Sequence, residues 1–279
     1  MGVQLNVLRK SLRDQRWQIV GFGLALFLMA ALIVAIWPSY RNTVASIQLP
    51  EAVQAFLGSD LNYSMASGFI SAEYFSWIPV LLIIYAVIQG TGAVAGEESS
   101  GTIDLLMAQP ITRANMVLQK SIAATVGSAL IIGFGFLGFA VTIPPVDIDL
   151  SVGDAALASA NMLPITLFHF ALALWLGSVA PNRATAVAIA VAVATAGYFL
   201  NTVAAIVGSV SWLQYASPFY YYGAGLPLVK GLDWARVAAL LGPTLLLVAW
   251  AMHSFDRRDI IVGGASNVRL RDLLRRVTG

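Results

Sequence analysis

Long uncharged apolar stretches recur along this 279-residue chain and constrain its fold more than any other feature. A helix rises about 1.5 Å per residue, so about 20 apolar residues cross the roughly 30 Å hydrocarbon core of a bilayer. An open strand in lipid would leave its backbone groups unpaired. We therefore predict an all-α integral membrane protein with six transmembrane helices, at about residues 17–37, 75–96, 121–143, 157–180, 184–208 and 237–255.

Composition agrees with a chain solvated mainly by lipid and argues against several kinds of active site. Only 11% of the residues are charged, compared with about 25% in soluble domains. Cysteine is absent and only His169 and His253 are histidines, which makes a thiolate or histidine metal centre improbable. Neither Lys10 nor Lys120 has the glycines of a phosphate-binding loop before it. We expect no enzymatic activity, and no metal or cofactor bound by this chain.

The two ends of the chain are basic and flank the membrane domain, residues 17–255. Residues 1–16 mix leucine and valine with arginine and lysine, which predicts an amphipathic interfacial helix that lies on the membrane surface. Residues 256–279 form a basic tail. Clusters of this kind usually meet anionic lipid headgroups, so we expect membrane lipids as partners and no nucleic acid.

The distribution of lysine and arginine predicts the orientation of the spans. With an even number of spans, both termini lie on one side of the membrane. Thirteen of the sixteen lysines and arginines then fall on that side, and only Arg41, Lys230 and Arg236 fall on the other. Because positive charge is enriched in cytoplasmic segments, we predict a multi-pass protein of the plasma membrane with both termini in the cytoplasm.

The loop between the second and third spans, residues 97–116, reads as a short helix with defined ends. Gly101 and Thr102 supply its start and Pro110 its stop. Asp104 suits the positive end of the helix dipole. An apolar tip follows that acidic residue, made by Leu105, Leu106 and Met107. Thr112 can then cap the third span. This pattern fits either a rigid contact for a soluble partner or an interfacial loop whose leucines dip into the membrane.

Residues 96–106, Gly-Glu-Glu-Ser-Ser-Gly-Thr-Ile-Asp-Leu-Leu, followed by Pro110 and Arg113, resemble the signature loop of the type 2 ABC exporter permeases. The resemblance extends from the basic N-terminal helix to residues 255–259 and so covers nearly the whole chain. It implies that the loop is a cytoplasmic coupling helix, which docks in a groove of a separate ABC ATPase subunit. That subunit would bind ATP and Mg, and a second permease copy would complete a homodimer or a heterodimer.

The same resemblance assigns the residues that couple the permease to the ATPase. It implies that Glu97 is an interaction hub at the end of the second span, although an ordinary charged residue beside a membrane span is the alternative. The residues implied in coupling are Glu97, Glu98, Gly101, Thr102, Asp104, Leu105, Leu106, Pro110 and Arg113.

The expected activity is export of an amphipathic, drug-like or lipid-like substrate, because the spans offer few buried charges to bind an ion or a sugar. Aromatic and polar positions on the second and fifth spans are candidates for the substrate path: Tyr85, Gln89, Tyr198 and Asn201. An ion-coupled secondary transporter would need carboxylates deep in the membrane, and none is found. An intramembrane enzyme lacks a nucleophile with its base. A membrane anchor that does not transport stays open as an alternative.

Glycines within the third span, Gly133, Gly135 and Gly138, match the spacing of a dinucleotide-binding fingerprint. That fingerprint requires a preceding strand and a phosphate-binding turn, whereas these glycines lie inside an apolar stretch. Small residues in a membrane span usually let two helices approach closely. We therefore predict that they serve helix packing.

Overall fold

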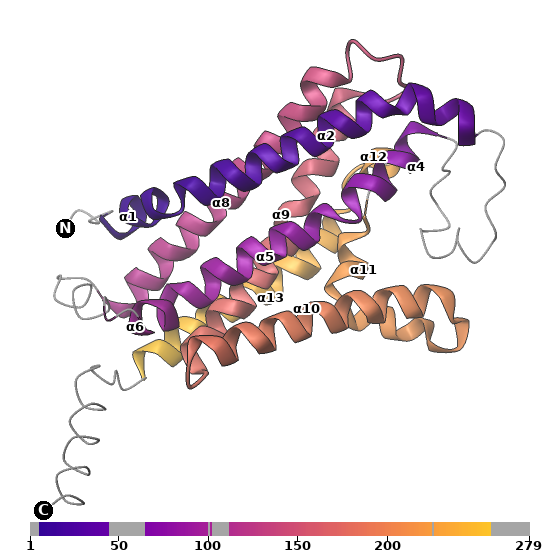
Figure 1. Cartoon of the computed structure of the whole chain (residues 1–279). Coiled ribbons are helices and arrows are strands. Elements are labelled where there is room, and N and C mark those ends of the chain that lie inside the picture. Colours follow the sequence, from indigo (N-terminus) through magenta and orange to yellow (C-terminus); the bar gives the residue numbers. More distant parts are fainter. Residues whose placement is uncertain (1–5, 45–64, 100, 102–111, 225, 258–279) are drawn as a thin grey trace, which may run out of the picture.

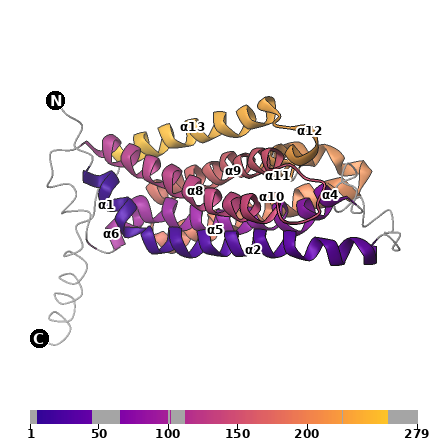
Figure 2. The same ribbon diagram turned by 90° about the horizontal axis from the view of Figure 1, so that it is seen from above.

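The structure, a computed structural model, describes residues 6–44, 65–99, 101, 112–224 and 226–257. Every regular element in these ranges is a helix. Six helical segments are long and apolar enough to cross a membrane, and they lie side by side in one bundle (Figures 1 and 2). The predicted all-α fold with six membrane spans is confirmed. The segments are Arg16–Arg41, Ala66–Ser99, Arg113–Thr142, Val152–Val179, Arg183–Ile206 and Trp234–Asp256.

A short helix precedes the first span, and π-helical turns interrupt the second. α1 (Asn6–Asp14) leads into α2 (Arg16–Val44), which contains the first span. The second span is a succession of short helices: α4 (Ala66–Ile70), η1 (Ser71–Phe75), α5 (Ile78–Thr91), η2 (Gly92–Gly96) and α6 (Glu97–Ser99). The elements η1 and η2 are π-helices, a form that is frequent at functional sites.

The last four spans are continuous helices, with short helices before the final one. The four are α8 (Arg113–Thr142), α9 (Val152–Val179), α10 (Arg183–Ile206) and α13 (Trp234–Asp256). Between α10 and α13 lie η3 (Gly208–Ala216), α11 (Pro218–Tyr222) and α12 (Pro227–Lys230). We call the end of the bundle that carries α1, α6 and the last turn of α13 the α1 end, and the opposite one the α12 end (Figure 1).

Several helices extend beyond the predicted spans: α8 begins eight positions before residue 121, and the helices of the first two spans are longer at the α12 end. The second begins at Ala66, nine positions before residue 75, because Glu73 lies in η1 with its side chain exposed and does not interrupt the helix. The first continues through Pro38 to Val44. Both differences lie at the α12 end, where a helix can carry polar residues once it leaves the hydrocarbon.

Polar side chains fix the starts of the four continuous helices. Thr112 accepts a hydrogen bond from the backbone N–H of Asn115 at the start of α8, which confirms the predicted cap. Ser151, Asn182 and Asp233 accept equivalent bonds at the starts of α9, α10 and α13. Such caps satisfy backbone N–H groups that have no partner within the helix.

Glycines of α8 let α2 and Tyr74 of η1 pack closely against it, as the sequence predicts. A Cβ added at Gly138 would overlap the backbone oxygen of Phe27, and one at Gly135 would overlap the hydroxyl of Tyr74. Gly133, in contrast, faces open space. Close approach therefore explains two of the three glycines. The neighbouring interior is aromatic, and Phe139 lies 4.8 Å from Tyr74 between ring centroids.

The short helix α11 is fixed inside the α12 end by buried hydrogen bonds. Ser217 donates its hydroxyl to the backbone oxygen of Gly197 at 2.7 Å, and Tyr222 donates to that of Phe75 at 2.8 Å. Asn161 of α9 donates to the backbone oxygen of Tyr222 at 2.7 Å. Burial, with a smaller contribution from Tyr74, raises the pKa of Tyr222 well above its usual value. Tyr222 therefore stays a neutral hydrogen-bond donor.

Candidate functional site at the base of the interspan loop

An ion pair joins the last turn of the second span to the third span, on either side of the loop 100–112. The Nζ of Lys120 lies 2.6 Å from Oε1 of Glu97, and the two side chains are only 10% and 14% exposed. Lys10 of α1 approaches the same carboxylate oxygen at 3.9 Å and pairs with Asp14 at 3.3 Å. Water screens this pair less than an exposed one, and loss of either partner would leave the other charge buried, so the contact links the two spans at the base of the loop.

The returning end of the loop is fixed to the last span. Arg113, the first residue of α8, donates from Nη1 to the backbone oxygen of Phe255 at 2.9 Å. Its guanidinium carbon also lies 5.3 Å from the centre of the Phe255 ring. Phe255 is fully buried near the C-terminal end of α13, where helix carbonyls favour positive charge. Movement of the loop at Arg113 would therefore pull directly on α13.

The N-terminal helix is seated on α8 at the same end of the bundle. The backbone N–H of Leu8 donates to Oε1 of Gln119 at 3.0 Å, and Val7 is buried. Only one face of α1 is covered, since Asn6, Arg9 and Lys10 remain exposed.

Gln15, at the junction of α1 and α2, is buried and ties three spans together. Its Nε2 donates to the backbone oxygen of Ala123 at 3.2 Å, and its Oε1 accepts the hydroxyl of Tyr85 at 2.6 Å. Gly127 makes this arrangement possible, because a Cβ there would overlap the Tyr85 hydroxyl. The first, second and third spans are thus linked through one amide.

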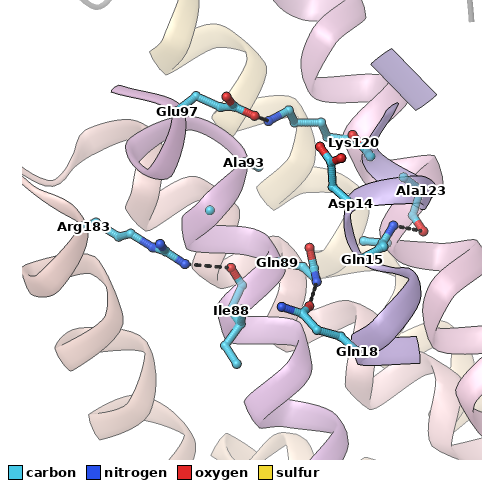
Figure 3. Close-up of a pocket in the computed structure, with 13 residues that line it drawn as sticks. Asp14, Gln15, Gln18, Ile88, Gln89, Ala93, Glu97, Lys120, Ala123 and Arg183 are labelled. Atoms are coloured by element: carbon cyan, nitrogen blue, oxygen red, sulfur yellow. Dashed lines mark hydrogen bonds and ion pairs between the residues drawn. The ribbon is translucent and has the colours of Figure 1, made fainter. Parts of the chain in front are cut away.

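A polar pocket of about 200 Å³ lies between these elements (Figure 3). Asp14 and Lys120 stand on one side, Arg183 of α10 stands on the other, and Glu97 lies above (Figure 3). Gln89 of α5 donates to Gln18 of α2 along the lower wall. The guanidinium of Arg183 lies near the glycines of η2 and donates to the backbone oxygen of Ile88 at 3.5 Å.

The lining of this pocket is strongly polar. It combines two carboxylates with two cations and three glutamine amides, and several of these groups pair with one another, such as Lys120 with Glu97 and Gln89 with Gln18. Among the described residues, no three His, Cys, Asp or Glu side chains are grouped so that they could hold a metal ion.

The structure describes four of the nine residues implied in coupling. Glu97 and Arg113 make the contacts given above. Glu98 follows Glu97 in α6, and Gly101 adopts a left-handed conformation with φ of 70°. The other five lie outside the described residues: Thr102, Asp104, Leu105, Leu106 and Pro110.

The four residues suggested for a substrate path do not form one group. Tyr85 is fully buried and bonded to Gln15, whereas Gln89, one turn further along α5, lines the polar pocket. Tyr198 packs edge-on against Phe219 with a centroid distance of 5.4 Å. Tyr198 and Asn201 lie on α10, 15 and 18 residues from the pocket residue Arg183, or about 22 and 27 Å along the helix.

Sequence reasoning did not single out Gln15, Gln18 or Arg183 for the site. All three are polar residues at the edges of apolar stretches, where polar residues are ordinary. Only their burial, or their contacts across helices, distinguishes them from other flanking residues.

A comparison with protein families gives one match that covers most of the chain. The family described as "ABC-2 family transporter protein" matches residues 5–260, which include all six candidate spans. No curated protein matches the chain.

Proposed function

Because the chain belongs to the ABC-2 transporter family, we propose that it is the permease subunit of an ATP-driven exporter in the plasma membrane. ATP and Mg bind to a separate ATPase subunit, and both termini of the permease face the cytoplasm. The distribution of lysine and arginine along the sequence supports this orientation, since thirteen of the sixteen fall in segments assigned to the side of the two termini.

The observation that carries the proposal is the rigid base of the interspan loop. The ion pair between Glu97 and Lys120 and the bond from Arg113 to Phe255 connect both ends of the loop to spans. A push on the loop by a soluble partner would therefore reach the second, third and sixth spans together. The partner in this proposal is an ABC ATPase, which contacts the apolar tip at Leu105 and Leu106.

A second permease copy, identical or homologous, completes the transporter in this proposal. The spans α2, α10 and α13 are the least covered in the single chain. They expose large apolar side chains such as Leu32, Phe199 and Leu245. Lipid or a neighbouring subunit can cover such surfaces equally well, and a path between two copies would use part of them.

The proposed substrate is an amphipathic or lipid-like molecule. The polar pocket at the α1 end would receive its head, because this pocket offers charges of both signs and three amides. The apolar surfaces of the spans would accommodate its tail. Export, from the inner side to the outer side, is the proposed direction.

The experiment that tests the function is co-purification of the chain with its ABC ATPase, followed by measurement of ATP hydrolysis in lipid. The double variant Leu105→Asp, Leu106→Asp should lose the complex and its stimulated hydrolysis. The matched variant Leu105→Ile, Leu106→Ile keeps the tip apolar and should behave like the wild type. If the aspartate variant binds and hydrolyses normally, the coupling role of the loop is wrong. If no ATPase binds at all, an ion-coupled transporter or a membrane anchor becomes the better interpretation.

A further inference from the structure

The polar pocket at the α1 end contains one cation that its neighbours do not neutralise. Lys120 pairs with Glu97, and Lys10 lies 3.3 Å from Asp14 and 3.9 Å from Glu97. These two lysines and two carboxylates sum to no net charge. Arg183 lines the same pocket and forms no ion pair with any residue that the structure describes. The charge of Arg183 is therefore left to meet a ligand.

The guanidinium of Arg183 lies flat against the glycines of η2. A Cβ built at Gly96 would lie 3.7 Å from the guanidinium carbon and 3.8 Å from Nε and Nη1. Because the carbon is the nearest of the three atoms, the face of the group covers this glycine. A Cβ at Gly92 would lie 3.5 Å from Nη2. An arginine has five N–H donors, and the bond to the backbone oxygen of Ile88, at 3.5 Å, occupies one of them.

The acidic groups of the pocket stay away from this guanidinium. The carboxylate of Glu97 is directed toward Lys120, and Asp14 lies across the pocket from Arg183 (Figure 3). An anion bound by Arg183 would therefore meet carboxylates that already have cationic partners.

The start of α10 also favours an anion beside Arg183. Arg183 is the first residue of this helix and follows the capping residue Asn182. The positive end of the helix dipole lies here, and it opposes a cation and favours an anion. Helix stability therefore does not explain an arginine at this position. A bound anion would be attracted both by the guanidinium and by the helix terminus.

A second pocket, of about 330 Å³ at the α12 end, differs in this respect. It contains Arg236, whose Nε lies 3.4 Å from Oδ2 of Asp233 and whose Nη1 donates to the backbone oxygen of Tyr220 at 3.0 Å. An anion there would compete with Asp233 for the guanidinium. Of these two pockets, the one at the α1 end is the better site for an anion.

An apolar surface continues from the α1-end pocket along the second span. Ile88 lines the pocket. Ile84, Leu81 and Trp77 follow at intervals of three or four residues and are 46%, 38% and 56% exposed. Residues at such intervals share one face of a helix. From Ile88 to Trp77 this face extends about 16 Å, so an apolar chain whose head lies in the pocket can run along it.

We propose that the polar pocket binds the singly charged anionic head of an amphiphile through Arg183, with the tail along Ile84 and Leu81. The head is a phosphodiester or a carboxylate, since either presents two oxygens to the guanidinium fork. This assignment rests on the function proposed above, because it names the class of substrate that the permease takes up.

Native mass spectrometry of the full-length chain, purified in a nonionic detergent, tests this recognition without the ATPase. The probes are lysophosphatidylglycerol, which carries one negative charge, and lysophosphatidylcholine, which has the same acyl chain and no net charge. The wild type should prefer the anionic probe about tenfold, the value of one charge-assisted hydrogen bond. Arg183→Gln should abolish the preference. Arg183→Lys keeps the charge but loses the fork and should retain part of it.

Arg13→Gln is the matched control, because Arg13 is exposed at the same end of the bundle and does not line the pocket. It should keep the preference of the wild type, and thermal unfolding checks that each variant is folded. An equal loss of preference in Arg13→Gln would show that general surface charge attracts the probe, and would overturn the assignment. A preference that survives in Arg183→Gln would overturn it as well.

The headgroup without its chain, glycerophosphoglycerol, distinguishes an amphiphile from a soluble anion. It should not displace lysophosphatidylglycerol at equal concentration, and displacement would refute the role of the apolar surface. Failure of the proposed function gives a different pattern. A chain that binds no ABC ATPase but keeps its charge preference would refute the exporter and not the anion site. A chain that stimulates the ATPase but shows no preference would refute the anion site alone.

Discussion

The ion pair between Glu97 and Lys120 gives the sharpest prediction. Removal of one partner from a buried pair costs about 3–5 kcal/mol, because the other charge stays buried. Here the side chains are 10% and 14% exposed, and Lys10 can still approach Glu97 from 3.9 Å. We therefore expect Lys120→Met to lower the free energy of unfolding by about 2 kcal/mol, less than for a fully buried pair.

The double variant Glu97→Gln, Lys120→Met should recover most of this loss, because neither charge is then left without its partner. A double-mutant cycle should give a coupling energy of about 2 kcal/mol. Unfolding by SDS in mixed micelles measures the stability of all four proteins. A coupling energy below about 0.5 kcal/mol, the value of an exposed pair, would refute the idea that the base of the loop is held by this contact. Measurement of ATP hydrolysis in the complex with the ATPase then shows whether a variant loses communication with the ATPase or only stability.

Three further predictions concern packing and buried hydrogen bonds. Gly138→Ala should force α2 away from α8 and destabilise the protein by about 1–3 kcal/mol. Gly133 faces open space, so Gly133→Ala should leave the stability unchanged, and thermal unfolding compares the two variants. Gln15→Leu leaves the hydroxyl of Tyr85 without its buried acceptor and should cost about 1–3 kcal/mol in the same assay. Arg113→Met removes a charge-assisted bond to Phe255 and should cost about 1.5 kcal/mol; equal stability of the variant and the wild type would contradict this role.

Much of the fold could be predicted because it depends on short-range chemistry. The number of spans follows from the length of each uncharged stretch, and the cap at Thr112 follows from residues three apart. The helix of the second span begins before the predicted span, because Glu73, which looks like a break in the sequence, does not interrupt it. In the folded chain its side chain points outward from the helix and stays exposed.

The site was predicted less completely. The sequence indicated Glu97 and Arg113 through their place in the loop, but it did not indicate their partners. Lys120 and Phe255 lie 23 and 142 positions away from them. Gln15 contacts residues 70 and 108 positions away. No periodicity or local pattern links positions this distant.

The sequence by itself determined that this chain spans a membrane as six helices and that one loop between spans is distinctive. The physical reason is that lipid selects each span by its own length and apolarity, without reference to the rest of the chain. Only the tertiary structure decided which polar side chains are buried and paired, and where the two pockets lie. Those outcomes depend on how the helices pack, because a polar group in a bundle is stabilised only by the partner that another helix brings to it.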